Sequence, residues 1–189
     1  MRAYGSIMKS NDIFRLLEEN ARMAGASKTA LIKTEEIVFD SHFRQMCESN
    51  SCGIYGRSHS CPPAIGEAND LIDNVKSYRY AFIYQTVSTI EDSFDIEGMG
   101  QARLAIFSIA SKLSEITRNV GINALHLSAG ACSICERCTK IDGLPCRFPN
   151  LMISSLEAHC IDVTSLARAS DMRYTNGDNT VTYFGAVFF

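Results

Sequence analysis

Two strand-forming stretches flank one long amphipathic stretch in the middle of the chain. Residues 78–87, YRYAFIYQTV, are rich in aromatic and β-branched residues, which favours a strand. Apolar residues then recur at helical spacing over residues 99–121, and residues 122–130, INALHLSAG, return to a strand pattern. Strand, helix and strand in this order form a βαβ unit, whose two strands run parallel with a right-handed crossover. The pattern therefore predicts an α/β fold.

Shorter patterns complete the predicted fold. We expect further helices over residues 11–24, 66–76, 154–159 and 164–169, a short strand over residues 35–40 and a buried strand in the closing stretch NTVTYFGAVFF. We predict one domain over residues 1–189. It has a small mixed or mostly parallel sheet, flanking helices and two cysteine-rich metal-binding loops.

Composition narrows the function classes. The 189 residues carry a formal net charge of -3, which does not suggest a basic surface for nucleic acid. No apolar run approaches the roughly 18 residues of a membrane span, and the start of the chain has no signal-peptide pattern. We expect a cytoplasmic protein with neither a nucleic-acid nor a membrane partner.

Eight cysteines are the most unusual feature of the composition. In a cytoplasmic chain the thiols stay reduced, so clustered cysteines indicate metal binding or catalysis more often than disulfides. A disulfide scaffold also scatters its cysteines, whereas four of these fall between Cys132 and Cys146. We therefore favour metal binding over a disulfide framework.

The second cysteine group consists of Cys132, Cys135, Cys138 and Cys146. Structural zinc usually takes two separate pairs of ligands. Three cysteines spaced two residues apart instead let one loop reach three irons of a cube, as in bacterial ferredoxins. The spacing thus favours a [4Fe–4S] cluster held by these four residues, with zinc as the alternative.

Charged residues lie between these ligands. Arg137, Lys140 and Arg147 supply positive charge near four thiolates, although any one of them alone is more typical of a solvated face. Gly130 allows the backbone to approach a cluster closely, and Gly143 eases the turn toward Cys146.

The first cysteine group consists of Cys47, Cys52 and Cys61, and Cys61 precedes two prolines. Three thiols leave a metal incompletely ligated. A fourth ligand could be His59, His42, a carboxylate such as Glu48, water or a substrate. The group could equally share the metal of the second group, form a zinc site or remain as free thiols.

Cys160 and His126 stand apart from both groups. An isolated cysteine is typically a small buried apolar residue, and we expect this of Cys160. His126 lies in a predicted strand, so we expect a core histidine with its hydrogen bonds satisfied.

The chain resembles an uncharacterised family of small, cysteine-rich predicted metal-binding proteins from archaea and anaerobic bacteria, a domain of unknown function. The resemblance rests on CESNSCGIYGRSHSCPP, GACSICERCTKIDGLPCRFP, SSLEAHCIDV and NTVTYFGAVFF, and runs from about residue 30 to the end. It implies that both cysteine groups occupy the family's cysteine positions. Cys160 and Phe148 depart from the pattern, which has glycine and histidine there. The resemblance strengthens metal binding and implies no reaction.

Three function classes remain open. The first is an iron–sulfur protein that passes electrons to a redox protein partner in anaerobic metabolism. The second is an enzyme with an open metal site at the first cysteine group, where Tyr55, Arg57 and His59 would serve as acid–base or anion-holding groups. The third is a zinc-binding structural or interaction protein.

Overall fold

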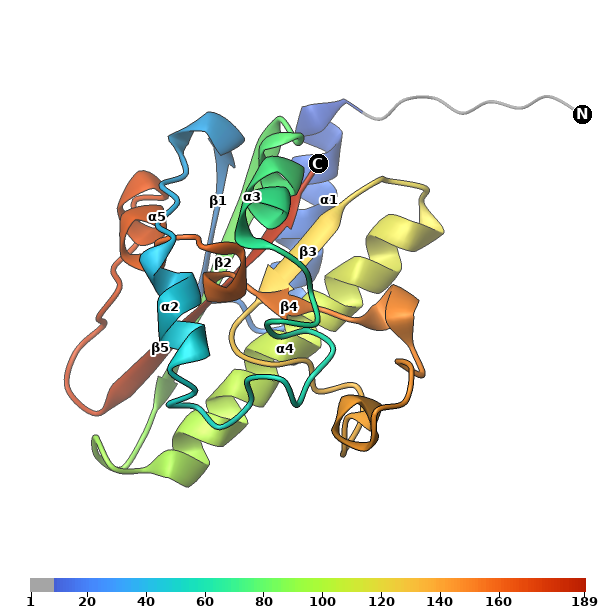
Figure 1. Cartoon of the computed structure of the whole chain (residues 1–189). Coiled ribbons are helices and arrows are strands. Elements are labelled where there is room, and N and C mark those ends of the chain that lie inside the picture. The colour runs from blue at the N-terminus through green and yellow to red at the C-terminus, as the bar shows by residue number, and fades with distance from the viewer. Residues whose placement is uncertain (1–8) are drawn as a thin grey trace, which may run out of the picture.

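A five-stranded mixed sheet forms the centre of the fold (Figure 1). The structure is a computed structural model that describes residues 9–189. Its strands follow the spatial order β1-β2-β5-β3-β4. In chain order they are β1 (Lys28–Lys33), β2 (Tyr80–Thr89), β3 (Leu125–Ser128), β4 (Ser154–Ser155) and β5 (Thr180–Phe188). The single α/β fold confirms the predicted fold class.

Helices cover both faces of the sheet. They are α1 (Ser10–Met23), α2 (His42–Glu48), α3 (Ala68–Lys76), α4 (Ile96–Asn119) and α5 (Val163–Ala169). Strand alternation divides β2 between two cores: Phe82 and Tyr84 pack with α1 and α4, whereas Ala81 and Ile83 pack with α3 and α5. The fold therefore has three layers, helix, sheet and helix (Figure 1).

The central strand–helix–strand unit is confirmed, with one addition. Strands β2 and β3 are each antiparallel to β5, so they run parallel to one another, and α4 connects them. Strand β5 lies between them and is buried at Phe184, Ala186, Val187 and Phe188, which explains its apolar residues on both faces. Because three of the four strand pairings are antiparallel, the mostly parallel alternative is wrong.

Two short segments differ from their predicted structure. Residues 35–40 form no strand: β1 ends at Lys33 and a 3-10 helix, Thr34–Glu36, follows, because the Glu36 carboxylate accepts a hydrogen bond from Lys33 N at 2.7 Å and bends the chain. Residues 154–159 form no regular helix. Ser154 and Ser155 instead pair with the end of β3 as β4, and a 3-10 helix, Glu157–His159, comes after them.

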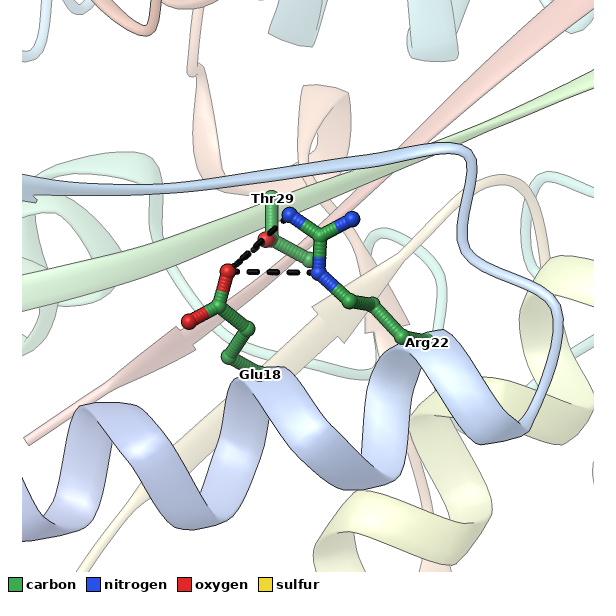
Figure 2. A network of polar contacts seen from close by, with 3 residues as sticks. All are labelled: Glu18, Arg22 and Thr29. Atoms are coloured by element: carbon green, nitrogen blue, oxygen red, sulfur yellow. Dashed lines mark hydrogen bonds and ion pairs between the residues drawn. The ribbon is translucent and has the colours of Figure 1, made fainter.

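A polar network joins α1 to the edge strand β1 (Figure 2). Glu18 Oε1 accepts hydrogen bonds from Arg22 Nε at 3.2 Å, Arg22 Nη2 at 3.0 Å and Thr29 Oγ1 at 3.1 Å. Such an exposed pair contributes less than about 1 kcal/mol, so the buried Leu17 and Ala21 account for most of the attachment of α1.

His126 is a core histidine, as predicted, but the expectation of satisfied hydrogen bonds is wrong, because its buried Nδ1 atom has no partner within residues 9–189. Its side chain is buried, its Nε2 atom hydrogen-bonds Thr117 Oγ1 at 2.8 Å, and burial followed by the charge of Arg118 lowers its pKa to about 4. In the unfolded chain the pKa of histidine is about 6.5. The unfolded state therefore binds a proton at a higher pH than the folded state, and stability is lost as the pH falls from about 6.5 toward 4.

We therefore expect His126→Gln to flatten the acid limb of the stability curve. The variant keeps a hydrogen-bonding side chain but has no titrating ring. Between pH 6.5 and pH 4, its free energy of unfolding should therefore fall by about 3 kcal/mol less than that of the parent chain. Urea unfolding across this range measures the difference, with the exposed His42→Gln as the matched control. Parallel acid limbs in the parent and the His126 variant would contradict the prediction.

Over residues 9–189, no helix combines the length and apolar character that crossing a membrane requires. The predicted single-domain boundaries include residues 1–8, which lie outside the described part of the chain.

Candidate metal centre

The second cysteine group lies on the loop between β3 and β4, residues 129–153, which we call the second cysteine loop. The loop contains only two 3-10 helices, Thr139–Asp142 and Pro149–Leu151. At its start Gly130 has φ 71°, and a Cβ there would lie 3.0 Å from Arg103 Cδ, so the turn requires glycine. Arg103, from α4, donates hydrogen bonds to Ala131 O at 3.2 Å and Ser133 Oγ at 3.0 Å. The sequence alone gave no sign of this role for Arg103.

All four cysteines of the second group line one cavity, together with Ser58, His59 and Ser60 of the segment that carries the first group. The cavity offers about 20 Å³ of open space, roughly enough for one water molecule. A larger bound group therefore requires the second cysteine loop to move outward. A loop held by short 3-10 helices, rather than by sheet pairing, allows such a movement.

The two cysteine-rich segments lie against each other at one end of the sheet (Figure 1). We call residues 47–67 the first cysteine loop. Ser60 is completely buried, its hydroxyl accepts a hydrogen bond from Cys132 N at 2.9 Å, and its carbonyl accepts one from Ser154 Oγ at 2.7 Å. His59 Nε2 donates to Leu144 O at 2.9 Å. Ser60 thus attaches the first loop to the start of the second and to β4 directly after its end, and His59 attaches it to the middle of the second loop.

Replacing Ser60 by Ala should loosen this attachment. In the variant, the partly buried Cys132 N–H has no hydrogen-bond acceptor. The free energy of unfolding should therefore fall by about 1–3 kcal/mol. Urea unfolding of the variant measures it. Ser51→Ala is the matched control, because Ser51 is exposed on the same loop and should change stability by less than about 0.5 kcal/mol. Equal midpoints for both variants would contradict the role of Ser60.

Cys138 is surrounded by donors that stabilise its thiolate. Partial burial raises the pKa of Cys138, but backbone N–H groups of Lys140 and His59, the Ser58 hydroxyl and the charge of Arg147 outweigh burial and lower the pKa overall. A thiol that is readily deprotonated is suited to bind a metal, because the thiolate is the ligand.

Cys61 connects the two cysteine groups. Burial raises the pKa of Cys61, hydrogen bonds from Ser60 and Ser58 oppose this rise, and the negative charges of Cys52 and Cys138 add to it. Ser60 Oγ lies 3.9 Å from Cys61 Sγ. Cys61 therefore lies within electrostatic reach of thiols from both groups.

Cys47 lies in the last turn of α2, and its surroundings differ from those of Cys138. Burial raises the pKa of Cys47 most strongly. The neighbouring thiols of Cys61 and Cys52 and the carboxylate of Glu157 raise this pKa further, whereas the positive charge of Arg44 lowers it. The three thiols of the first cysteine group therefore lie within electrostatic reach of one another. If residues 35–40 and 122–130 both formed parallel strands, the two cysteine groups would meet at one edge of the sheet, but residues 35–40 form no strand. Helix α2 and the contacts of Ser60 bring the groups together.

Several side chains were predicted as a fourth ligand of the first group. His42 and Glu48 are exposed, and His59 is engaged with Leu144. A carboxylate that raises the pKa of Cys47 is that of Glu157, more than one hundred residues away in sequence. No local spacing could have identified it, because a 3-10 helix after β4 carries it to α2.

None of the eight cysteines, all of which lie in the described residues, forms a disulfide. Cys160 is completely buried, which confirms its prediction as a small apolar core residue. Across residues 9–189, no three or more His, Cys, Asp and Glu side chains are grouped closely enough to hold one metal ion. The thiols of the second group are spread around their cavity rather than gathered at one point.

Comparison with known proteins gives one match. A family model described as "Predicted metal-binding protein (DUF2284)" matches residues 30–189. The curated proteins and the solved structures contain no match to the chain. The matched stretch covers most of the chain and includes both cysteine groups and the strands β2 to β5. The chain therefore belongs to the DUF2284 family of predicted metal-binding proteins.

Proposed function

We propose that the chain is an iron–sulfur protein whose second cysteine group holds a [4Fe–4S] cluster. The observation that carries this proposal is the cavity lined by Cys132, Cys135, Cys138 and Cys146. A cubane cluster takes one thiolate at each of four irons, so its ligands lie farther apart than the four ligands of a single zinc ion. Thiols spread around one cavity, with no three donors grouped for one ion, favour the cluster.

The surroundings of the cavity fit an anionic cluster. Hydrogen bonds to cluster sulfurs and nearby net charge set the reduction potential of such centres. Cys138 receives N–H groups of Lys140 and His59 and lies in the field of Arg147. These donors stabilise negative charge on sulfur, which supports a centre that accepts electrons.

The first cysteine group forms a second centre in this proposal. Its three thiols lie within electrostatic reach of one another, and Cys61 lies within electrostatic reach of Cys138 in the other group. Electrons can pass between centres held by adjacent loops, which supports a role in electron transfer.

The electron carrier that docks here is a redox protein with an apolar patch surrounded by carboxylates. Ile141, Leu144 and Phe148 of the second cysteine loop expose 40%, 56% and 45% of their surface. Lys140 and the exposed Arg147 lie beside them. Apolar contacts and complementary charge support docking close to the cluster.

Anaerobic preparation tests the proposal. Protein made with iron supplied should contain iron and acid-labile sulfide in equal amounts, about four of each for every loaded [4Fe–4S] cluster. The reduced protein should give an EPR signal. Stoichiometric zinc without acid-labile sulfide, from protein prepared in this way, would end the iron–sulfur proposal in favour of a zinc protein.

A further inference from the structure

Arg44 is a buried cation on α2. Its side chain is 8% exposed, and its Nη2 atom donates a hydrogen bond to Gly66 O. Its Nη1 atom is also buried and has no hydrogen-bond partner in the structure. Arginine stays protonated in proteins, so this position carries a full positive charge away from water.

Arg44 forms no ion pair within residues 9–189, and the carboxylate that acts with it on Cys47, Glu157, is not within ion-pair distance of it. The three ion pairs within residues 9–189 join Arg22 to Glu18, Lys33 to Glu35 and Arg137 to Asp142. Asp40, four residues earlier in the chain, is exposed and accepts a hydrogen bond from His42 N instead. A buried charge is strongly unfavourable unless an opposite charge compensates it.

Arg44 lies beside the first cysteine group. It precedes Cys47 by three residues on α2, so both side chains lie on the same side of that helix. Its positive charge acts on the Cys47 thiol, as described above. Metal binding converts thiols to thiolates, so a loaded first centre places negative charge next to this cation.

We infer that Arg44 is the buried counter-charge of the metal–thiolate centre at Cys47, Cys52 and Cys61. This inference rests on the proposed function, because it requires a metal centre at the first cysteine group. Arg44 is a positioning residue: it does not coordinate the metal and acts on the centre through its charge. It stabilises the bound centre, and it stabilises the reduced form more, because that form carries one more negative charge.

The inference predicts opposite effects of one substitution on the metal-free and the loaded chain. Arg44→Met keeps the apolar contacts of the side chain and removes the charge. We expect the metal-free variant to be at least as stable as the metal-free parent, since an uncompensated charge is gone. In the loaded variant, the chelator concentration that removes iron from the first centre should fall about tenfold, and the reduction potential of this centre should fall.

Two variants serve as controls. Arg44→Lys keeps the charge and should retain iron against the chelator within about threefold of the parent. Arg79→Met removes an exposed arginine that lies over the Tyr80 ring and should leave iron retention and potential unchanged. The iron of the first centre is defined as the fraction of the total iron content that the Cys47→Ala variant loses.

Three outcomes would overturn the inference. Equal destabilisation of the metal-free and loaded Arg44→Met chains, with unchanged iron retention, would show that Arg44 serves only to bind Gly66 O. If Arg44→Met does not fold, a loss of iron in Arg44→Lys far beyond threefold would refute a charge effect. Unchanged iron in Cys47→Ala would remove the first centre itself and the inference with it, while the [4Fe–4S] cluster of the second group would stand.

Discussion

Cys138→Ala should lose the iron and sulfide of the second cysteine group. The variant removes one of four thiolates that line the cavity, and backbone N–H groups of Lys140 and His59 and the Ser58 hydroxyl stabilise this thiolate. A cluster with an unligated iron that opens to solvent is readily broken down, so iron and sulfide from this centre should fall to background. Metal and sulfide analysis after anaerobic preparation, together with the EPR signal of the reduced protein, measures the loss.

Cys160→Ala is the matched control for this prediction. Cys160 is completely buried and lies outside both cysteine groups, so its removal should leave iron, sulfide and the EPR signal intact. Cys61→Ala should affect the first centre more than the second. Full iron and sulfide content in Cys138→Ala would contradict the assignment of the second cysteine group.

Gly185→Ala should destabilise the fold by about 3 kcal/mol, the upper end of the range for overpacking a core. Gly185 pairs with Tyr84 in the centre of the sheet, and a Cβ at this position would overlap the Tyr84 ring. That ring is completely buried and lies 6.0 Å, centroid to centroid, from the stacked Phe82 ring, so it has little space to move. The midpoint of thermal unfolding should fall by roughly 6–12 °C.

The same substitution at Gly100 provides the contrast. Gly100 lies within α4, and a Cβ there would meet nothing within 4 Å. Gly100→Ala should therefore stabilise the chain by about 0.5–1 kcal/mol, because alanine restricts the unfolded backbone and favours helix. Equal unfolding midpoints for the two variants would contradict the close contact of Gly185 with Tyr84.

Local patterns predicted the elements that bury a continuous apolar surface. The helix over residues 99–121 and the two strands beside it repeat their apolar residues at the period of their own backbone, and α4, β2 and β3 appear where the pattern indicates. The strand predicted over residues 35–40 is wrong because the Glu36 carboxylate accepts a hydrogen bond from Lys33 N and bends the backbone there. Hydrophobic periodicity does not reveal such a contact between a side chain and the backbone.

Spacing also predicted that one loop brings Cys132, Cys135, Cys138 and Cys146 together, and all four line one cavity. Spacing did not predict the neighbours of the cysteine groups. Ser60 and Glu157 act on Cys132 and Cys47 from other segments, and Arg103 bonds the second cysteine loop from α4. Each was an ordinary polar residue in the sequence, as was Arg44, whose hydrogen bond to Gly66 spans 22 residues.

The sequence by itself determined the α/β class, the central strand–helix–strand unit and the two sets of thiols, because each depends on residues close together in the chain. Only the tertiary structure decided that β5 lies between β2 and β3. It alone decided that the two cysteine loops share one end of the sheet and that Arg44, three residues before Cys47, is buried. Those features depend on contacts between distant segments, which form only when the apolar faces of the sheet are covered.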